Sequence, residues 1–378
     1  MALAPHGARE PHDPNTSSGP PNGPPPPPDP RAAFGTPRIE TEAGAGDPVP
    51  PSPPGTTGTP TPDSGPFRPL GPGDPHRVDT YELRARIGSG GMGGVYLSHT
   101  PAGRPVALKL VRAEFADDPG FRRRFEAEVR AARRVQGVFT APVVDSRTDG
   151  AVPWLATAYV PGLPLNEGIR VAGPLPFPSL LLLIAGVAEA LHSIHAAGVV
   201  HRDLKPGNVL LAADGPRVID FGIARAADAT PLTGSEVRIG TPAYMAPEQV
   251  MGGDAGPAAD IFALGLLAHH AGTGGHPFGE GTGHGIMYRI VQEAPDLGAL
   301  PAALRETIAA CLAKDPGQRP TPERIVEACR RLSPDGTLRV TGDWLPAQLM
   351  VEIDRRQRLT PGEARTPGGP GDPGVPPA

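Results

Sequence analysis

The run His201-Arg-Asp-Leu-Lys-Pro-Gly-Asn208 carries the side chains that a phosphoryl-transfer site needs. The carboxylate of Asp203 could orient a substrate hydroxyl and accept its proton. The amide of Asn208 and the carboxylate of Asp220, in Asp220-Phe-Gly222, could together hold Mg²⁺ on the phosphates of a nucleotide. Ala246-Pro-Glu248 follows. One such tripeptide occurs by chance in many proteins, but the ordered set predicts phosphoryl transfer.

A glycine-rich segment upstream could bind the phosphates, because residues without side chains let backbone N–H groups approach them. Dinucleotide-binding folds share its G-x-G-x-x-G pattern but place a helix directly after the loop. Here the turn Pro101-Ala-Gly103 and the apolar run Pro105 to Val111 follow, which predicts a hairpin. The residues expected to contact the nucleotide are Ile87, Gly88, Ser89, Gly90, Gly91, Met92, Gly93, Gly94 and Val95.

Lysine is rare in this chain, which makes its positions informative. Among 35 lysines and arginines, only Lys109, Lys205 and Lys314 are lysines. A lysine at a motif position in an arginine-rich chain indicates that a compact ammonium group is required there. Lys109 lies in the apolar run and Lys205 lies two residues after Asp203, whereas Lys314 is typical of a surface residue.

The chain resembles the eukaryotic-like Ser/Thr protein kinases of bacteria, and the actinobacterial ones most closely. The resemblance rests on the motifs above and on Val106-Ala-Leu-Lys109, which is similar to the kinase strand whose lysine binds the α and β phosphates. It implies an α+β fold of two lobes, a small antiparallel β-sheet lobe with one helix and a larger, mostly helical lobe. It also implies ATP as cofactor, with Mg²⁺, or Mn²⁺ as the alternative, held by Asn208 and Asp220.

The resemblance also proposes a counter-ion for Lys109. A helix is predicted over 119–136, and its Phe-x-x-Glu-Val aligns Glu128 with the glutamate that pairs with the strand lysine in active kinases. Glu126 would then be a solvated neighbour, and the reverse assignment stays open, because isolated helix glutamates are usually surface charges.

The apolar run that ends at Val160 breaks at Pro161-Gly162, where a hinge to a second lobe is expected. By resemblance, Thr157 is the gatekeeper of the nucleotide site. The residues whose backbone would hydrogen-bond adenine are Ala158, Tyr159 and Val160.

The substrate class is implied by Lys205 and Thr241. A lysine two residues after the aspartate distinguishes Ser/Thr kinases from Tyr kinases, and Thr241 is similar to the threonine that hydrogen-bonds both Asp203 and Lys205. These three residues are the expected catalytic set, and Ser and Thr hydroxyls of protein substrates are the expected acceptors.

Two other classes of function remain open. A small-molecule phosphotransferase shares the fold but usually lacks a long segment ending in Ala-Pro-Glu. A pseudokinase would serve as a scaffold, but it typically lacks Asp203, Lys109 or Asp220, and this chain has all three.

The segment before Ala246 is expected to be a switch set by phosphorylation. Arg202 directly precedes Asp203 and would place a buried cation beside the catalytic loop until an anion arrives. By resemblance to the actinobacterial kinases, the expected sites are Thr233 and Ser235, phosphorylated within a homodimer; Thr230 is a further candidate. The alternative is a surface loop that is phosphorylated without consequence.

Composition divides the chain, because its 53 prolines and 50 glycines are unevenly distributed, and Pro, Gly, Ser and Thr dominate residues 1 to about 75. Around Trp344 an amphipathic segment could dock on the large lobe. The expected parts are a disordered Pro/Gly-rich tail (1–75), a kinase domain (76–334) with a small lobe (81–160) and a large lobe (161–334), and a partly disordered C-terminal tail (335–378).

The elements follow from apolar periodicity and turn residues. Strands are expected near 81–87, 94–99, 105–111, 142–146 and 152–160. Further helices are expected near 180–197, 257–271, 282–292, 301–313 and 321–332. By resemblance, Asp260 braces the catalytic loop, and Glu248 forms a buried ion pair with Arg319.

The net charge and the cysteine content limit which partners and which cell compartment are expected. The net charge of −5 offers no basic footprint for nucleic acid and no polybasic lipid anchor. Cys311 and Cys329 are expected to be free core thiols rather than a disulfide. Met1 to Glu10 lacks the apolar core of a signal peptide, and the longest apolar run, Leu180 to Val187, is short for a membrane span, so we expect a cytoplasmic protein without a transmembrane segment.

Overall fold

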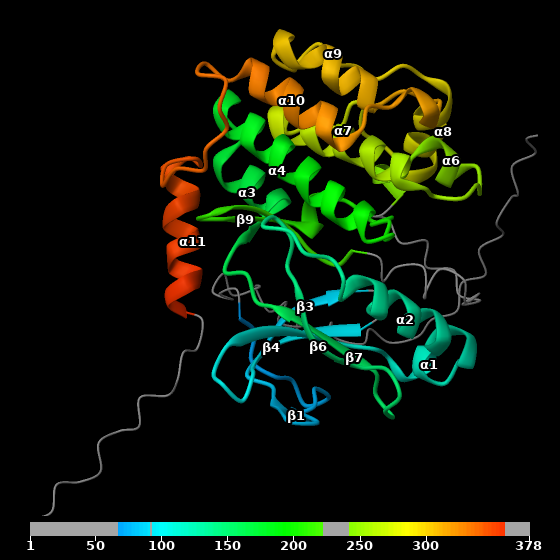
Figure 1. The fold of residues 1–378 in the computed structure, drawn as a ribbon, viewed down its shortest axis with the longest axis vertical. Coiled ribbons are helices and arrows are strands. Elements are labelled where there is room, and N and C mark those ends of the chain that lie inside the picture. Colours follow the sequence, from blue (N-terminus) through cyan, green and yellow to red (C-terminus); the bar gives the residue numbers. More distant parts are fainter. Residues whose placement is uncertain (1–66, 91–92, 222–241, 360–378) are drawn as a thin grey trace, which may run out of the picture. The chain divides into compact units, whose positions relative to one another are not determined.

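Residues 67–90, 93–221 and 242–359 are described by the computed structural model of the protein (Figure 1). They form two lobes, and the predicted α+β fold is confirmed. The small lobe contains a five-stranded antiparallel sheet in the order β3-β4-β5-β7-β6. Its strands are β3 (Ala85–Gly90), β4 (Gly93–His99), β5 (Pro105–Leu110), β6 (Val143–Arg147) and β7 (Trp154–Ala158).

The alternation of side chains along β5 decides where Lys109 points. Val106, Leu108 and Leu110 are buried on one face of the strand, so Lys109 belongs to the opposite face. There it is paired in register with Leu155 of β7.

The described small lobe begins earlier than the boundary predicted at residue 75. The Arg68 N–H donates to the Arg86 carbonyl at 2.9 Å. The Asp74 carboxylate accepts from the Tyr96 hydroxyl at 2.6 Å and from the Gly71 N–H at 2.9 Å. These bonds tie residues 67–75 to the sheet beside a short hairpin of β1 (Arg77–Val78) and β2 (Tyr81–Glu82).

One longer helix, α2 (Pro119–Ala132), packs on this sheet after the short α1 (Ala113–Ala116). The Asp118 side chain caps α2 by accepting from the Gly120 N–H at 2.7 Å. Phe121 and Phe125 are buried one turn apart, as the predicted helical periodicity requires. The helix is shorter than the predicted 119–136.

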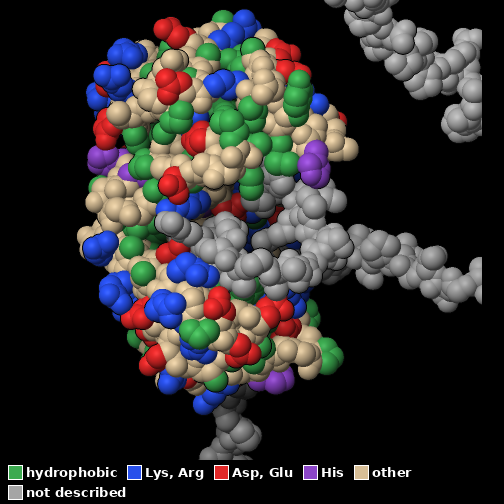
Figure 2. All heavy atoms as spheres, turned by 90° about the vertical axis from the view of Figure 1, so that its right-hand side faces the viewer, with side chains coloured by type: hydrophobic (Ala, Val, Ile, Leu, Met, Phe, Trp, Pro, Cys, Tyr) green, Lys and Arg blue, Asp and Glu red, His purple; other side chains and the backbone are tan. Residues whose placement is uncertain are grey.

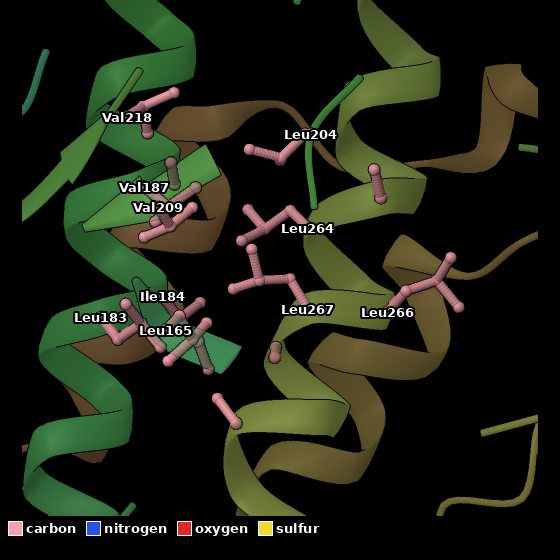
Figure 3. Close-up of a cluster of buried hydrophobic side chains, with 14 of the residues drawn as sticks. Leu165, Leu183, Ile184, Val187, Leu204, Val209, Val218, Leu264, Leu266 and Leu267 are labelled. Carbon is pink, nitrogen blue, oxygen red and sulfur yellow. The ribbon is translucent and has the colours of Figure 1, made fainter. Parts of the chain in front are cut away.

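The large lobe is organised around α4 (Phe177–Ala196) and α7 (Pro257–Thr273). Figure 3 shows Leu183, Ile184 and Val187 of α4 facing Leu264 and Leu267 of α7. By length and composition α4 is apolar enough to cross a membrane. A buried core helix meets the same criterion, and most of the α4 side chains are buried in this lobe.

The remaining elements surround this centre. Those that follow the hinge are β8 (Leu163–Pro164), α3 (Leu165–Ala172), η1 (Pro206–Asn208), β9 (Val209–Ala212) and β10 (Gly215–Val218). Those further along are η2 (Pro242–Tyr244), α6 (Pro247–Val250), α8 (Gly283–Gln292), α9 (Ala302–Cys311), η3 (Pro316–Gln318), α10 (Pro322–Leu332) and α11 (Ala347–Leu359). Cys311 and Cys329 are both free and buried, as predicted.

The surface carries both signs of charge. Figure 2 shows acidic and basic side chains intermixed over the described residues of both lobes on the face that it presents. Such a mixed surface produces little net field over a distance longer than the screening length.

Candidate active site

Leu204 holds the catalytic loop in place from within. Its side chain is buried and points toward Leu264 of α7 in Figure 3. The polar neighbours on either side, Asp203 and Lys205, stay accessible, with side chains about a quarter exposed (24% and 27%). The Lys205 ammonium lies 2.7 Å from the Asp203 carboxylate.

Asn208 completes this cluster from η1. Its amide nitrogen donates to the Asp203 carbonyl at 2.7 Å and approaches the Asp203 carboxylate at 3.3 Å. Because the nitrogen is used in this way, the amide oxygen is available for a cation. The structure thus brings together the predicted proton acceptor, the predicted lysine and one predicted metal ligand.

Asp260 braces the loop from α7, which confirms the prediction. Its carboxylate, 1% exposed, accepts from the backbone N–H groups of His201 and Arg202, each at 2.8 Å. The His195 ring nitrogen Nε2 lies 2.8 Å from the same carboxylate. A buried carboxylate with three donors is well satisfied, so it can hold the loop rigidly.

His201 is a functional residue that sequence reasoning undervalued. Its ring is fully buried, and Nε2 lies 3.1 Å from the Ile219 carbonyl, next to Asp220. It therefore joins the catalytic loop to the segment that carries the second metal ligand. The only sequence signal for this role is its place at the start of the His-Arg-Asp motif.

Two non-glycine residues of the site have left-handed backbones, Arg202 with φ 66° and Asp220 with φ 60°. This conformation is unfavourable for L-residues, and it persists only where the surroundings enforce it. The Asp260 bond to the Arg202 N–H and the Lys109 pair with Asp220 are such constraints.

Lys109 meets Asp220 across the lobes. The distance between Nζ of Lys109 and Oδ2 of Asp220 is 3.1 Å. Burial alone would raise the pKa of Asp220, but the nearby Lys109 ammonium, with smaller contributions from His201 and Lys205, lowers that pKa below its ordinary value. Asp220 is therefore a carboxylate at neutral pH, as a metal ligand must be.

The two glutamates considered as partners of Lys109 differ in exposure as expected. Glu126 is exposed and pairs with Arg130 at 2.7 Å, whereas Glu128, two residues later and so on roughly the opposite side of α2, is partly buried. Among the ion pairs of the described residues, the partner of Lys109 is Asp220. The pairing of Lys109 with Glu128 stays a prediction.

Two of the three hinge N–H groups are already hydrogen-bonded within the protein. The Ala158 N–H donates to Pro142 and the Tyr159 N–H donates to Pro105, at 3.0 and 3.2 Å. The Val160 N–H has no backbone acceptor among the bonds of the described residues. Of the three residues predicted to bind adenine, Val160 is thus the one with an N–H left to donate.

In the glycine-rich flap, Gly93 shows why a glycine is required. Its φ is 155°, and a Cβ there would lie 1.9 Å from the Leu110 carbonyl oxygen of β5. Of the other flap residues, Ile87, Gly88, Ser89 and Gly90 lie in β3, and Gly94 and Val95 lie in β4. Predicted site residues outside the described parts of the chain are Gly91, Met92, Thr233, Ser235 and Thr241.

The Ala-Pro-Glu segment is anchored as predicted. The two oxygens of Glu248 each lie 2.7 Å from a nitrogen of the Arg319 guanidinium, whose side chain is fully buried. Lys314, predicted as a surface residue, is instead half-buried: its ammonium donates to the Ile290 carbonyl and lies 4.2 Å from the centre of the Phe278 ring. Burial, aided by Arg319, lowers the pKa of Lys314 to about 8.

Comparisons with known proteins agree with this geometry. The protein kinase domain family matches residues 81–329. The chain is 48% identical over 283 residues to the probable serine/threonine-protein kinase PkwA of Thermomonospora curvata, an alignment that covers 75% of this chain and 37% of that protein. It is 45% identical over 304 residues to the serine/threonine-protein kinase AfsK of Streptomyces coelicolor, covering 79% of this chain and 38% of that protein.

The aligned region thus spans a little over a third of the length of these two relatives. Among solved structures, the PknI kinase domain of Mycobacterium tuberculosis matches with a TM-score of 0.54 at 29% identity, covering 67% of this chain and 96% of that domain. The chain therefore belongs to the protein kinase family, and the relatives to which it is similar are bacterial serine/threonine-protein kinases.

Proposed function

We propose that the chain transfers the γ-phosphoryl group of ATP to Ser and Thr hydroxyls of protein substrates. The observation that carries this proposal is the cluster of Asp203, Lys205 and Asn208, in which the carboxylate lies 2.7 Å from the lysine ammonium. The carboxylate is suited to orient a hydroxyl and accept its proton. The relatives described above are named as serine/threonine-protein kinases, which supports the same acceptor.

The residues of the site fit a nucleotide with a divalent cation. The Asp220 carboxylate and the Asn208 amide oxygen are hard oxygen ligands of the type that Mg²⁺ prefers, with Mn²⁺ as the alternative. When bound, the cation would neutralise the phosphate oxygens during transfer. Lys109, only 16% exposed, offers a nearly desolvated ammonium to the phosphates beside Asp220.

The chain's own residues then account for the transfer. Lys205 holds the Asp203 carboxylate and adds positive charge where the transferred group carries negative charge. Asp203 takes the hydroxyl proton as the substrate oxygen attacks the γ-phosphorus of ATP, and the bond from that phosphorus to ADP breaks as ADP leaves. Asp260 keeps the loop backbone immobile, so the catalytic groups are in place before the substrate arrives.

Activation-segment phosphorylation is the second part of the proposal. The Arg202 guanidinium is partly buried rather than fully buried, and no ion pair joins it to a carboxylate in the described part of the chain. A phosphate on Thr233 or Ser235 would supply the missing anion. We propose that one copy phosphorylates another in a transient homodimer.

The direct test is an assay of the purified chain with ATP, Mg²⁺ and a generic protein acceptor, followed by phosphoamino acid analysis. We expect phosphoserine and phosphothreonine on the acceptor. Asp203→Asn serves as the inactive variant, and Asp214→Asn, whose side chain is 75% exposed, serves as its matched control. Equal transfer by wild type and Asp203→Asn, or phosphate on tyrosine alone, would contradict the proposal.

A further inference from the structure

The chain around α11 is anchored to the strand that follows the catalytic loop. The Trp344 indole N–H donates to the Ala212 carbonyl at 2.9 Å, at the end of the strand β9 that follows Asn208. Figure 1 shows α11 beside α3. Four side chains of this segment are at most 3% exposed within the core of the large lobe, namely Trp344, Leu345, Leu349 and Ile353.

From this anchored helix, Arg356 reaches the chain just after the hinge. Its side chain is 14% exposed, and one guanidinium nitrogen lies 2.7 Å from the Glu167 carboxylate of α3. A second nitrogen donates to the Gly162 carbonyl at 3.3 Å. Nε donates to Glu352, one turn earlier in α11, at 3.2 Å. The guanidinium thus joins three segments at one point.

Gly162, which accepts a hydrogen bond from Arg356, is itself bonded to the hinge. Its N–H donates to the Val160 carbonyl at 2.8 Å. A Cβ on Gly162 would lie 2.9 Å from the Leu211 carbonyl oxygen, so its backbone is packed directly against β9. A displacement of Gly162 would therefore move Val160, the hinge residue with an N–H left to donate.

A cavity of about 1070 Å³ places α11 next to the nucleotide flap as well. The same cavity is bordered by the glycine-rich strand and by the C-terminal helix, although the two are far apart in sequence. Lining residues from these elements include Ile87, Gly88, Ser89, Glu352, Arg355 and Arg356.

We propose that Arg356 is a positioning residue for nucleotide binding: through Gly162 and Glu167 it holds the hinge so that Val160 stays aligned for adenine. This inference rests on the proposed kinase function. The C-terminal helix then sets ATP affinity without touching the acceptor or the transferred group. Losing Arg356 raises the Kd and the KM for ATP and leaves kcat and the KM for the protein acceptor unchanged.

Arg356→Gln and Arg358→Gln form a matched pair on one helix. Arg358 is 77% exposed and pairs with Asp354 on the same helix. Arg356→Gln should weaken ATP binding roughly fivefold, the scale of one partly exposed charge-assisted hydrogen bond. Arg358→Gln should leave it unchanged. ATP affinity is measured by equilibrium titration without turnover, and kcat and both KM values are measured on the same preparations.

Glu167→Gln removes the same ion pair by changing its other partner. It therefore keeps the test decisive if Arg356→Gln folds poorly. It should weaken ATP binding to a similar extent, and the double variant should be no worse than either single variant, because both remove one ion pair. Arg356→Lys should restore part of the affinity.

Three results would overturn the inference: unchanged ATP affinity in Arg356→Gln, effects of the two single variants that multiply in the double, or a lowered melting temperature with no change in ATP affinity. Failure of the proposed function is a different observation, since the wild-type chain would then transfer no phosphoryl group to the acceptor, whatever its affinity for ATP.

Discussion

Lys109 and Asp220 form an ion pair between the two lobes, with 3.1 Å between the ammonium nitrogen and the carboxylate oxygen. One partner lies in the sheet of the small lobe and the other follows β10 in the large lobe. The pair joins the predicted phosphate ligand to a predicted metal ligand, so both lobes are needed to assemble the nucleotide site.

Replacing Lys109 by arginine should abolish most activity even though the charge is kept. The guanidinium is wider than the ammonium, and the side chain is largely buried on β5. We expect a loss on the order of 10²-fold in kcat/KM, the scale for one preorganised electrostatic contact. Arg112→Lys, at an exposed position just after the same strand, is the control. Wild-type turnover by Lys109→Arg would show that Lys109 is not the phosphate ligand.

Asp203→Asn should lower the rate of phosphoryl transfer without changing the affinity for ATP. The amide cannot accept the hydroxyl proton, so kcat should fall by about 10² to 10⁴. ATP affinity and the melting temperature should stay close to wild type, because Asp203 is partly exposed and Asp260 braces the loop independently. Stopped assays measure kcat, and an equilibrium titration of the same protein measures the affinity for ATP. Near-normal kcat would refute the assignment of Asp203.

Breaking the Glu248–Arg319 pair should destabilise the large lobe strongly. Glu248→Gln leaves a fully buried guanidinium without its carboxylate, which typically costs about 3–5 kcal/mol of unfolding free energy. The backbone bonds of Arg319 to Ala258 and Ala313 place our expectation near the lower value. The matched control is Glu327→Gln in a half-exposed pair with Arg330, expected to change stability by under about 1 kcal/mol. Urea denaturation compares the two, and equal losses would contradict this account.

Stability should fall as the pH drops below about 6.5, because burial lowers the pKa of His269, His270 and His276. These groups are neutral in the folded chain, and the unfolded chain binds more protons once the pH falls below the ordinary histidine value. The contribution is therefore fully present above that value and is lost as the pH falls toward the lowered folded pKa values.

The His276→Gln variant tests this pH dependence. The His276 ring nitrogen Nε2 lies 2.8 Å from the Ala243 carbonyl, and its ring contacts Tyr244 edge-on. His269, His270 and Arg289 also act on its charge. Urea unfolding at pH 5.5, 6.5 and 7.5 should show a smaller drop on acidification for the variant than for wild type. Identical slopes would mean that His276 does not titrate with unfolding.

The double variant Thr233→Ala, Ser235→Ala should lose most transfer to an external acceptor. Without phosphate, the Arg202 guanidinium lacks the anion that would order the segment. Mass spectrometry of the purified wild type should find phosphate at one or both positions. Full activity in the double variant would refute the switch and leave the kinase assignment intact.

The motifs of the site could be predicted because their members are close in sequence. Asp203, Lys205 and Asn208 lie within six residues, and the loop between them brings the side chains together, as the 2.7 Å contact shows. The buried helices could also be predicted, because apolar side chains recur at helical spacing whatever they pack against. Their ends differ from the prediction by a few residues, since caps and fraying depend on neighbours.

The beginning and end of the described chain were harder to predict. Residues 67–75 look like the preceding Pro/Gly-rich tail in composition, but the bonds of Asp74 to Tyr96 and of Arg68 to Arg86 tie them to the small lobe. Lys314 has no motif around it, and its burial follows from tertiary contacts with the Ile290 carbonyl and the Phe278 ring.

The amino-acid sequence by itself determined which residue types are available for phosphoryl transfer and in which order they occur. The tertiary structure decided that Asp220 is the neighbour of Lys109 and where Arg356 lies. Arg356 and Glu167 are 189 residues apart. Contacts over such separations depend on how the apolar faces of α3, α4, α7 and α11 pack together, and no local propensity encodes that arrangement.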